Sequence, residues 1–230
     1  VFEKEDVTVY NYGKQKHGTL NMKEAFEVSS NYVFCTLGYE LGAETVKQEA
    51  EAFGINKEIS FDIPTAKSQI QYKKMSNIDA ALVSIGQGQL LMTPLHVAMM
   101  GSAVANKGTM MRPVLVDKVK TSSGITLSQS KPEILYNCVT EECAAYVDEL
   151  MCAVVSQGTG KSARISGVTV AGKTGTAENE TDRDHAWFVG YAPAENPQIC
   201  VAVLLENDGG AGGTNAAPIA RNVMRKYLGK

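Results

Sequence analysis

Residues 171–178 read Ala-Gly-Lys-Thr-Gly-Thr-Ala-Glu, and they follow a β-type run that ends at Val170. Side chains alternate between the two faces of a strand, so Lys173 is expected on one face, with Thr174 and Thr176 on the other. The glycines among them allow a ligand to approach the backbone closely. This pattern suits a strand edge that presents a cation and backbone N–H groups to a carboxylate or carbonyl. An ordinary turn at the end of a strand is the simpler alternative.

The composition of the 230 residues is that of a globular, soluble protein, with 44% hydrophobic and 20% charged residues. The length suits one large domain or two small ones. A net charge of −3 argues against nucleic acid as the main partner. The longest mostly apolar run, residues 90–105, is too short to span a bilayer. The five cysteines fit neither a disulfide framework nor a zinc site, and we interpret them as buried or partly buried thiols.

The first two thirds of the chain are predicted to be mainly helical. The predicted segments share helical spacing of apolar residues or helix caps, and they are 22–28, 33–41, 43–56, 93–106 and 140–155. Ser29, Ser30 and Asn31 fall at the junction between the first two segments. Residues of this kind prefer local hydrogen bonds, so they either cap a helix or hold a hydroxyl and an amide at a cleft.

The last third of the chain predicts a sheet. Residues 168–176, 185–192 and 198–205 read as three consecutive antiparallel strands, followed by a helix that begins near Asn215. The sequence therefore predicts an α+β fold, an antiparallel β-sheet flanked by helices. Residues 1–230 are expected to form a single domain. Its helical subdomain would span about 20–160, and its sheet and C-terminal helix about 165–230.

One motif is rejected as a nucleotide site. Residues 158–162, Gly-Thr-Gly-Lys-Ser, end like a phosphate-binding loop. The earlier glycine of that loop would fall at Val155, and a predicted helix rather than a strand precedes it.

Four segments carry a resemblance to a known family. They are 27–31 (EVSSN), 84–95 (SIGQGQLLMTPL), 170–178 (VAGKTGTAE) and 185–193 (HAWFVGYAP). A Ser-x-x-Lys, a serine–asparagine motif and a Lys-Thr-Gly together mark penicillin-binding proteins and class A β-lactamases. The chain resembles the C-terminal part of a class B penicillin-binding protein, a monofunctional D,D-transpeptidase, over most of its length. The resemblance implies a β-lactamase/transpeptidase-like fold.

The sequence departs from the family at the nucleophile. The family's nucleophilic serine lies in a Ser-x-x-Lys helix upstream of the serine–asparagine motif, and residues 1–28 contain no serine. The Ser-x-x-Lys that does occur, Ser128 to Lys131, lies in a polar turn region downstream of that motif, and we interpret it as chance. We therefore expect the chain to be truncated after the nucleophile, without the first strands of the sheet, and to be inactive alone.

The resemblance implies a role for each catalytic residue. The missing serine would attack the carbonyl between two D-alanines of a peptidoglycan stem peptide and form an acyl-enzyme. Ser29 would relay protons to the leaving amine, and Asn31 would hold the substrate amide. Lys173 would supply positive potential, and the Thr176 N–H would form half of the oxyanion hole.

Substrate binding is assigned to the strand that follows the lysine. Thr174, Gly175 and Thr176 would bind the substrate, with the two hydroxyls on its carboxylate. Because strict alternation separates these hydroxyls from Lys173, a twist or bulge would have to reconcile them. Neither a metal nor an organic cofactor is expected. The histidines are scattered, and we interpret His185 as structural.

The resemblance also implies partners and a location. The expected partners are D-Ala-D-Ala stem peptides, β-lactam antibiotics and other cell-wall synthesis proteins. The expected location is the extracytoplasmic face of the bacterial membrane, with the anchor outside these residues. Two alternatives are a β-lactam sensor of the same fold and a non-catalytic cell-wall scaffold. The segment 84–95 resembles transpeptidases more than sensors.

Overall fold

The computed structural model describes residues 1–181 and 183–230. The helices of this part are α1 (Met22–Glu27), α2 (Asn31–Ala52), α3 (Asn77–Val83), α4 (Pro94–Ala105), α5 (Glu141–Ser156) and α6 (Ala216–Tyr227). The strands are β1 (Phe2–Lys4), β2 (Val7–Val9), β3 (Gln69–Ile70), β4 (Leu90–Leu91), β5 (Thr109–Met111), β6 (Lys118–Lys120), β7 (Thr126–Gln129), β8 (Ile134–Asn137), β9 (Ala171–Ala177), β10 (His185–Ala192) and β11 (Ile199–Leu205). Short 3₁₀ turns lie at Tyr12–Lys14 and Lys161–Ala163.

Strands β9, β10 and β11 form the main sheet, in the order β11–β10–β9. Both pairings are antiparallel, which confirms the predicted run of three antiparallel strands. The register of β9 against β10 runs without a break from Ala171 opposite Tyr191 to Ala177 opposite His185. Within the described residues β9 pairs on one side only, so its other edge is open to a ligand or to another segment.

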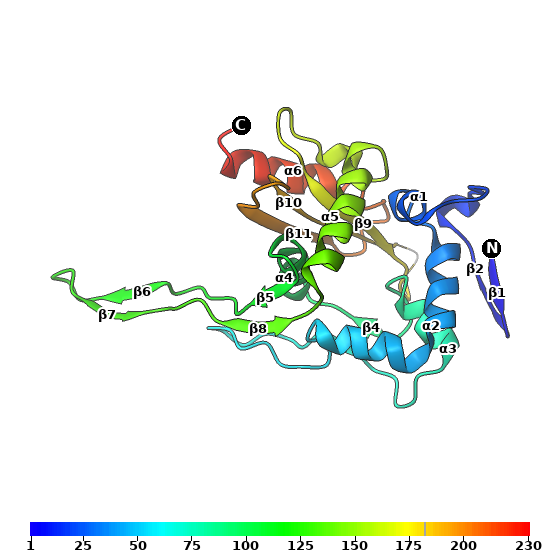
Figure 1. The fold of residues 1–230 in the computed structure, drawn as a ribbon, viewed down its shortest axis with the longest axis horizontal. Coiled ribbons are helices and arrows are strands. Elements are labelled where there is room, and N and C mark those ends of the chain that lie inside the picture. Colours follow the sequence, from blue (N-terminus) through cyan, green and yellow to red (C-terminus); the bar gives the residue numbers. More distant parts are fainter. Residues whose placement is uncertain (182) are drawn as a thin grey trace.

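Helices cover both faces of the main sheet, as the α+β prediction required (Figure 1). Helix α6 packs on β10 and β11 from one face, and α4 packs on the same two strands from the other. The approach of α4 is close: a Cβ on Gly101 would lie 2.7 Å from Val189 Cγ2. Helix α5 runs against β9.

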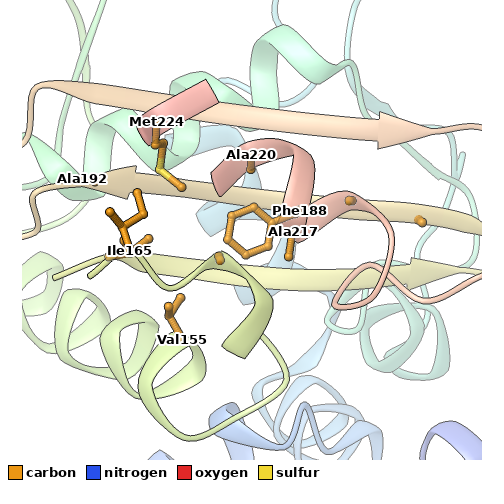
Figure 2. Close-up of a cluster of buried hydrophobic side chains, with 11 residues drawn as sticks. Val155, Ile165, Phe188, Ala192, Ala217, Ala220 and Met224 are labelled. Atoms are coloured by element: carbon orange, nitrogen blue, oxygen red, sulfur yellow. The ribbon is translucent and has the colours of Figure 1, made fainter. Parts of the chain in front are cut away.

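The core beneath α6 centres on Phe188, which is fully buried (Figure 2). Ala217 and Ala220 of α6 lie against this ring, and Met224 and Val155 extend the cluster. Alanines on the inner side of α6 let the helix lie close to the sheet, which leaves the phenyl ring to fill the space between them. This packing holds β9 and β10 in place behind the free edge.

The helix signals in the sequence are borne out by the structure. Asn21 and Glu24 form a capping box at α1, and Thr93 and Thr140 cap α4 and α5 with their side chains. The two helical pieces predicted over 33–56 form α2, with a break at Gly42, whose φ is +81°. In the described part of the chain, none of the helices is both long and apolar enough to cross a membrane.

Strands β6 and β7 form a hairpin that projects away from the rest of the molecule (Figure 1). Every residue of the two strands is exposed. At its base, Asp62 accepts hydrogen bonds from the N–H groups of Leu115 (2.6 Å) and Val116 (2.9 Å). A salt bridge of 2.8 Å between Arg112 and Glu133 closes the same region. The hairpin is therefore anchored at its base.

Candidate active site

The turn between α1 and α2 places Ser29. The Ser30 N–H donates to the Ala25 carbonyl (2.9 Å), and the Ser29 N–H donates to the Phe26 carbonyl (3.2 Å). This pair of bonds is the Schellman ending of a helix, in which the residue after the cap adopts a left-handed conformation. Ser29 takes that position with φ of +55°, where glycine is usual. The turn holds the Ser29 side chain in one direction.

The next two residues begin α2. Ser30 is buried, and its hydroxyl accepts from the Val33 N–H (3.4 Å) as the N-cap. The Asn31 side chain donates from Nδ2 to the Tyr10 carbonyl (2.8 Å). The capping interpretation of the Ser-Ser-Asn stretch is confirmed at Ser30. The functional interpretation of Ser29 and Asn31 stays a prediction.

Lys173 reaches from β9 to this junction. Its Nζ donates to Ser29 Oγ (2.8 Å) and to the Thr174 carbonyl (2.9 Å). The Phe26 ring lies beneath the ammonium, with 5.6 Å between Nζ and the ring centroid, which favours the cation. Burial lowers the pKa of Lys173 to about 8. The lysine is therefore protonated at neutral pH and close to losing its proton above it.

A cluster of threonine hydroxyls lies on the other face of β9. Thr174 Oγ1 and Thr159 Oγ1 are 2.7 Å apart, so one hydroxyl donates to the other. Thr176 Oγ1 accepts from the Gly212 N–H (3.4 Å). A hydroxyl carries one proton, so one proton of the threonine pair and the proton of Thr176 are both available to an added acceptor. Two such donors match the two oxygens of a carboxylate.

Glycines let two loops touch the strand at this point. A Cβ on Gly212 would collide with the carbonyl oxygens of Gly175 and Trp187, and a Cβ on Gly213 would collide with the carbonyl oxygen of Thr159. The loop around residue 212 therefore approaches β9 at backbone distance, and the loop around residue 159 lies against the 212 loop in the same way. Side chains at these positions would push the hydroxyl groups apart.

The strand keeps its alternation through the site. The ladder between β9 and β10 has no register shift, so the bulge considered above as one way to bring Thr174 and Thr176 to the Lys173 face does not occur. Cross-strand neighbours confirm the division, because Thr174 lies opposite the buried Phe188 and Lys173 lies opposite Val189. The lysine–serine group and the threonine group therefore flank the free edge of β9 from its two sides.

The family follows from comparison of the chain with known proteins. Residues 2–225 match the family model described as the penicillin binding protein transpeptidase domain. The chain belongs to this family. The penicillin-binding domain is 37% identical to the peptidoglycan D,D-transpeptidase PbpA of Mycolicibacterium smegmatis, over 96% of this chain and 47% of that protein. It is 35% identical to MrdA of Haemophilus influenzae, over 95% of this chain and 38% of that protein.

Solved structures agree with the assignment. The structure of penicillin-binding protein A from M. tuberculosis, described as a ceftriaxone acyl-enzyme complex, matches with a TM-score of 0.90 at 34% identity. The match covers 97% of this chain and 53% of that one. These relatives confirm the resemblance to class B penicillin-binding proteins and the transpeptidase-like fold. The penicillin-binding domain spans about half the length of the PbpA relatives.

Some residues of the site were not found from the sequence. The Gly-Thr-Gly of residues 158–160 was used only to reject a phosphate-binding loop, yet Thr159 contacts Thr174. The lysine motif was singled out by its lone lysine and by the glycines on either side. Thr159 also stands between two glycines, so those glycines were a usable signal. Phe26 and Gly212 had no comparable signal, because only the folded chain brings them to β9.

The rejected Ser-x-x-Lys lies outside this region. Ser128 is exposed on β7, opposite Val119, in the projecting hairpin (Figure 1). Among the described residues no three His, Cys, Asp or Glu side chains are grouped to hold a metal ion.

Proposed function

We propose that this protein is a peptidoglycan D,D-transpeptidase that crosslinks stem peptides through a serine acyl-enzyme. The observation that carries the proposal is the 2.8 Å contact between Lys173 Nζ and Ser29 Oγ beside the free edge of β9. It joins a cation to a hydroxyl where an extended peptide can lie along the strand. Relatives named peptidoglycan D,D-transpeptidase, 35–37% identical over 95–96% of this chain, support it.

In this mechanism a serine oxygen bonds to the carbonyl carbon of the penultimate D-alanine, and the bond to the nitrogen of the last D-alanine breaks. The attacking serine loses its hydroxyl proton, and the leaving amine gains a proton. Lys173 donates to Ser29 Oγ, so the Ser29 hydroxyl can pass its own proton to that amine and take one from Lys173. The proton released by the attacking serine returns to the lysine, so the step balances. The positive charge of Lys173 stabilises the negative charge that develops near the nucleophile.

The threonine group would hold the substrate carboxylate. Thr176 and the pair of Thr174 and Thr159 offer two hydroxyl protons at the strand edge. Gly175 leaves the backbone between them open to the peptide. The N–H of Thr176 would be half of the oxyanion hole, and such a donor is worth about 3 kcal/mol in the transition state.

Asn31 would hold the substrate amide. Its Nδ2 is bound to the Tyr10 carbonyl, which leaves Oδ1 as the atom that accepts from a substrate N–H. The turn that positions Ser29 also starts the helix that carries Asn31, so the two side chains are placed together.

The nucleophile is proposed to come from a Ser-x-x-Lys segment outside these 230 residues. Residues 1–28 contain no serine, and the chain spans less than half the length of the PbpA relatives. The 230-residue chain is then inactive alone.

Labelling with a fluorescent penicillin tests the proposal. The 230 residues alone should not be labelled, whereas the same chain extended by the natural upstream sequence should be. Peptidoglycan crosslinking by the extended protein is then measured with a stem-pentapeptide donor and an amine acceptor. Labelling of the short chain at Ser128 would contradict the assignment of the nucleophile. Labelling of the extended protein without crosslinking or D-alanine release would favour a β-lactam sensor.

We also propose that the protein works at the outer face of the bacterial membrane, where peptidoglycan is assembled. Solved relatives described as acyl-enzyme complexes with imipenem and penicillin G support β-lactams as ligands of this fold. Fractionation of cells that express the natural full-length protein, with protease treatment of spheroplasts, tests the location.

A further inference from the structure

His185, the first residue of β10, accepts a hydrogen bond from a backbone amide. The Asn207 N–H donates to His185 Nδ1 over 2.9 Å. A backbone N–H can only donate, so Nδ1 must carry a lone pair. This contact therefore requires the neutral ring, with its proton on Nε2.

A side-chain amide lies against the same ring. Asn179 Nδ2 lies 3.2 Å from Nε2 and 3.3 Å from Nδ1 of His185. Its two protons go to the Arg183 carbonyl (2.9 Å) and to Asn207 Oδ1 (3.1 Å), which identifies it as the amide nitrogen and leaves none for the ring. A protonated ring would turn an N–H toward the Asn207 N–H and lose that hydrogen bond.

The amide that His185 holds begins the loop that reaches the site. Asp208, the next residue, accepts from the Gly210 N–H (3.1 Å) and from the Asn215 side chain. Further along, Gly212 donates to Thr176 and lies against the Gly175 carbonyl. Residues 207–213 are therefore held at one end by His185, and at the other end they support β9.

We infer that His185 is a positioning residue whose neutral ring holds the 207–213 loop against β9, so that its protonation loosens the threonine side of the site. The effect on catalysis rests on the transpeptidase function proposed above. The effect on the loop does not, because it follows from the contacts within this chain.

The two connections around His185 carry charged side chains. Among the described residues these are Glu178, Glu180, Arg183, Asp184, Glu206 and Asp208. Arg183 ties the connections together, because its guanidinium donates to the Asp208 carbonyl (2.9 Å).

Two matched variants separate the loss of the acceptor for the Asn207 N–H from the protonation of the His185 ring. In His185→Asn the side-chain oxygen can take the place of Nδ1 and does not titrate. In His185→Gln the oxygen reaches the place of Nε2 instead, so the Asn207 N–H loses its partner. Both variants are polar and smaller than or similar in size to histidine, which limits damage to the fold.

Hydrogen exchange of the Asn207 and Gly212 amides is the first readout, corrected for intrinsic rates at pH 7.5 and 5.5. Protection in the natural chain should fall about tenfold at the lower pH, the scale of one lost hydrogen bond. His185→Asn should keep its protection at both values, and His185→Gln should be unprotected at both. Equal behaviour of the two variants, or a pH response retained in His185→Asn, overturns the inference.

The pH profile of penicillin acylation in the upstream-extended protein is the second readout. The acidic side of the pH–rate profile for acylation should shift in His185→Asn relative to the natural protein. Identical profiles would contradict the catalytic part of the inference. If the extended protein is not acylated at all, the proposed function fails, while the exchange data still decide the role of His185.

Discussion

Two serine–lysine pairs in this chain occupy very different surroundings. Ser29 and Lys173 come from residues 144 positions apart and meet at 2.8 Å beside β9. Ser128 and Lys131 stand three residues apart toward the base of the β6–β7 hairpin, where both are exposed. The local pair matches the family's Ser-x-x-Lys in letters, and the distant pair is the one that the fold brings together.

The difference shows what turns a strand edge into a site. At β9 the end of α1 and the loops around residues 159 and 212 all contact one strand, and the pKa of its lysine falls to about 8. The hairpin is held at its base, and its strands are exposed throughout. Neighbouring segments, more than the residue types, create the chemistry.

The largest expected effect comes from removing the buried charge. Lys173→Met keeps the length of the side chain and should slow penicillin acylation of the upstream-extended protein about 100- to 1,000-fold, the cost of losing one electrostatic donor. Lys131→Met is the matched control in the hairpin and should acylate at the natural rate. A similar fall in the acylation rate of both variants would show that the two serine–lysine pairs do not differ in function.

The next effect is a pH dependence of stability in the 230-residue chain. Below pH 8 Lys173 is charged in both the folded and the unfolded chain. Between about 8 and its ordinary value of 10.5 the unfolded chain holds a proton that the folded chain has lost, so the free energy of unfolding should rise with pH. Urea unfolding at several pH values measures it, relative to Lys173→Met. A constant difference between the two proteins across this range would show that the lysine is not perturbed.

A smaller effect is expected from the paired hydroxyls. Thr159→Val and Thr174→Val each remove one hydroxyl with little change of shape, and each should weaken acylation by about three- to tenfold. In a double-mutant cycle their stability effects should couple by about 1 kcal/mol. Thr169→Val, at an exposed position outside the site, is the control. Simple additivity would mean that the 2.7 Å contact contributes nothing.

The smallest effect on activity should come from the hairpin. The N–H groups of Val116 and Leu115 lower the pKa of Asp62, so their hold on the hairpin base is present above the ordinary carboxyl pKa of 3.8 and is lost as pH falls below it. Asp62→Asn should speed hydrogen exchange at both amides and leave acylation unchanged. Reduced acylation in this variant would show that the hairpin communicates with the site.

Local signals in the sequence predicted much of the fold. The capping box at Asn21 and the caps at Thr93 and Thr140 act within one helical turn, so a short window contains all the information. The three strands of the main sheet were also predictable from local sequence, because each strand pairs with the next one after a short connection.

The site was only partly predictable, for a physical reason. The lysine motif and Ser29 carried a family pattern, but the pairing of Thr159 with Thr174 depends on packing between a loop and a strand 15 residues apart. Phe26 is an ordinary apolar helix residue in the sequence, and its place beneath the Lys173 ammonium follows from how α1 docks. The catalytic and binding roles assigned to these residues stay predictions until the variants are measured.

The left-handed backbone at Ser29 carries a local energetic cost. A side chain in that conformation costs about 1 kcal/mol, which glycine would not incur. Glycine would also leave the buried Lys173 ammonium without the hydroxyl to which it donates, at a cost of about 1–3 kcal/mol. The strain at Ser29 is therefore offset by the hydrogen bond that its own hydroxyl makes.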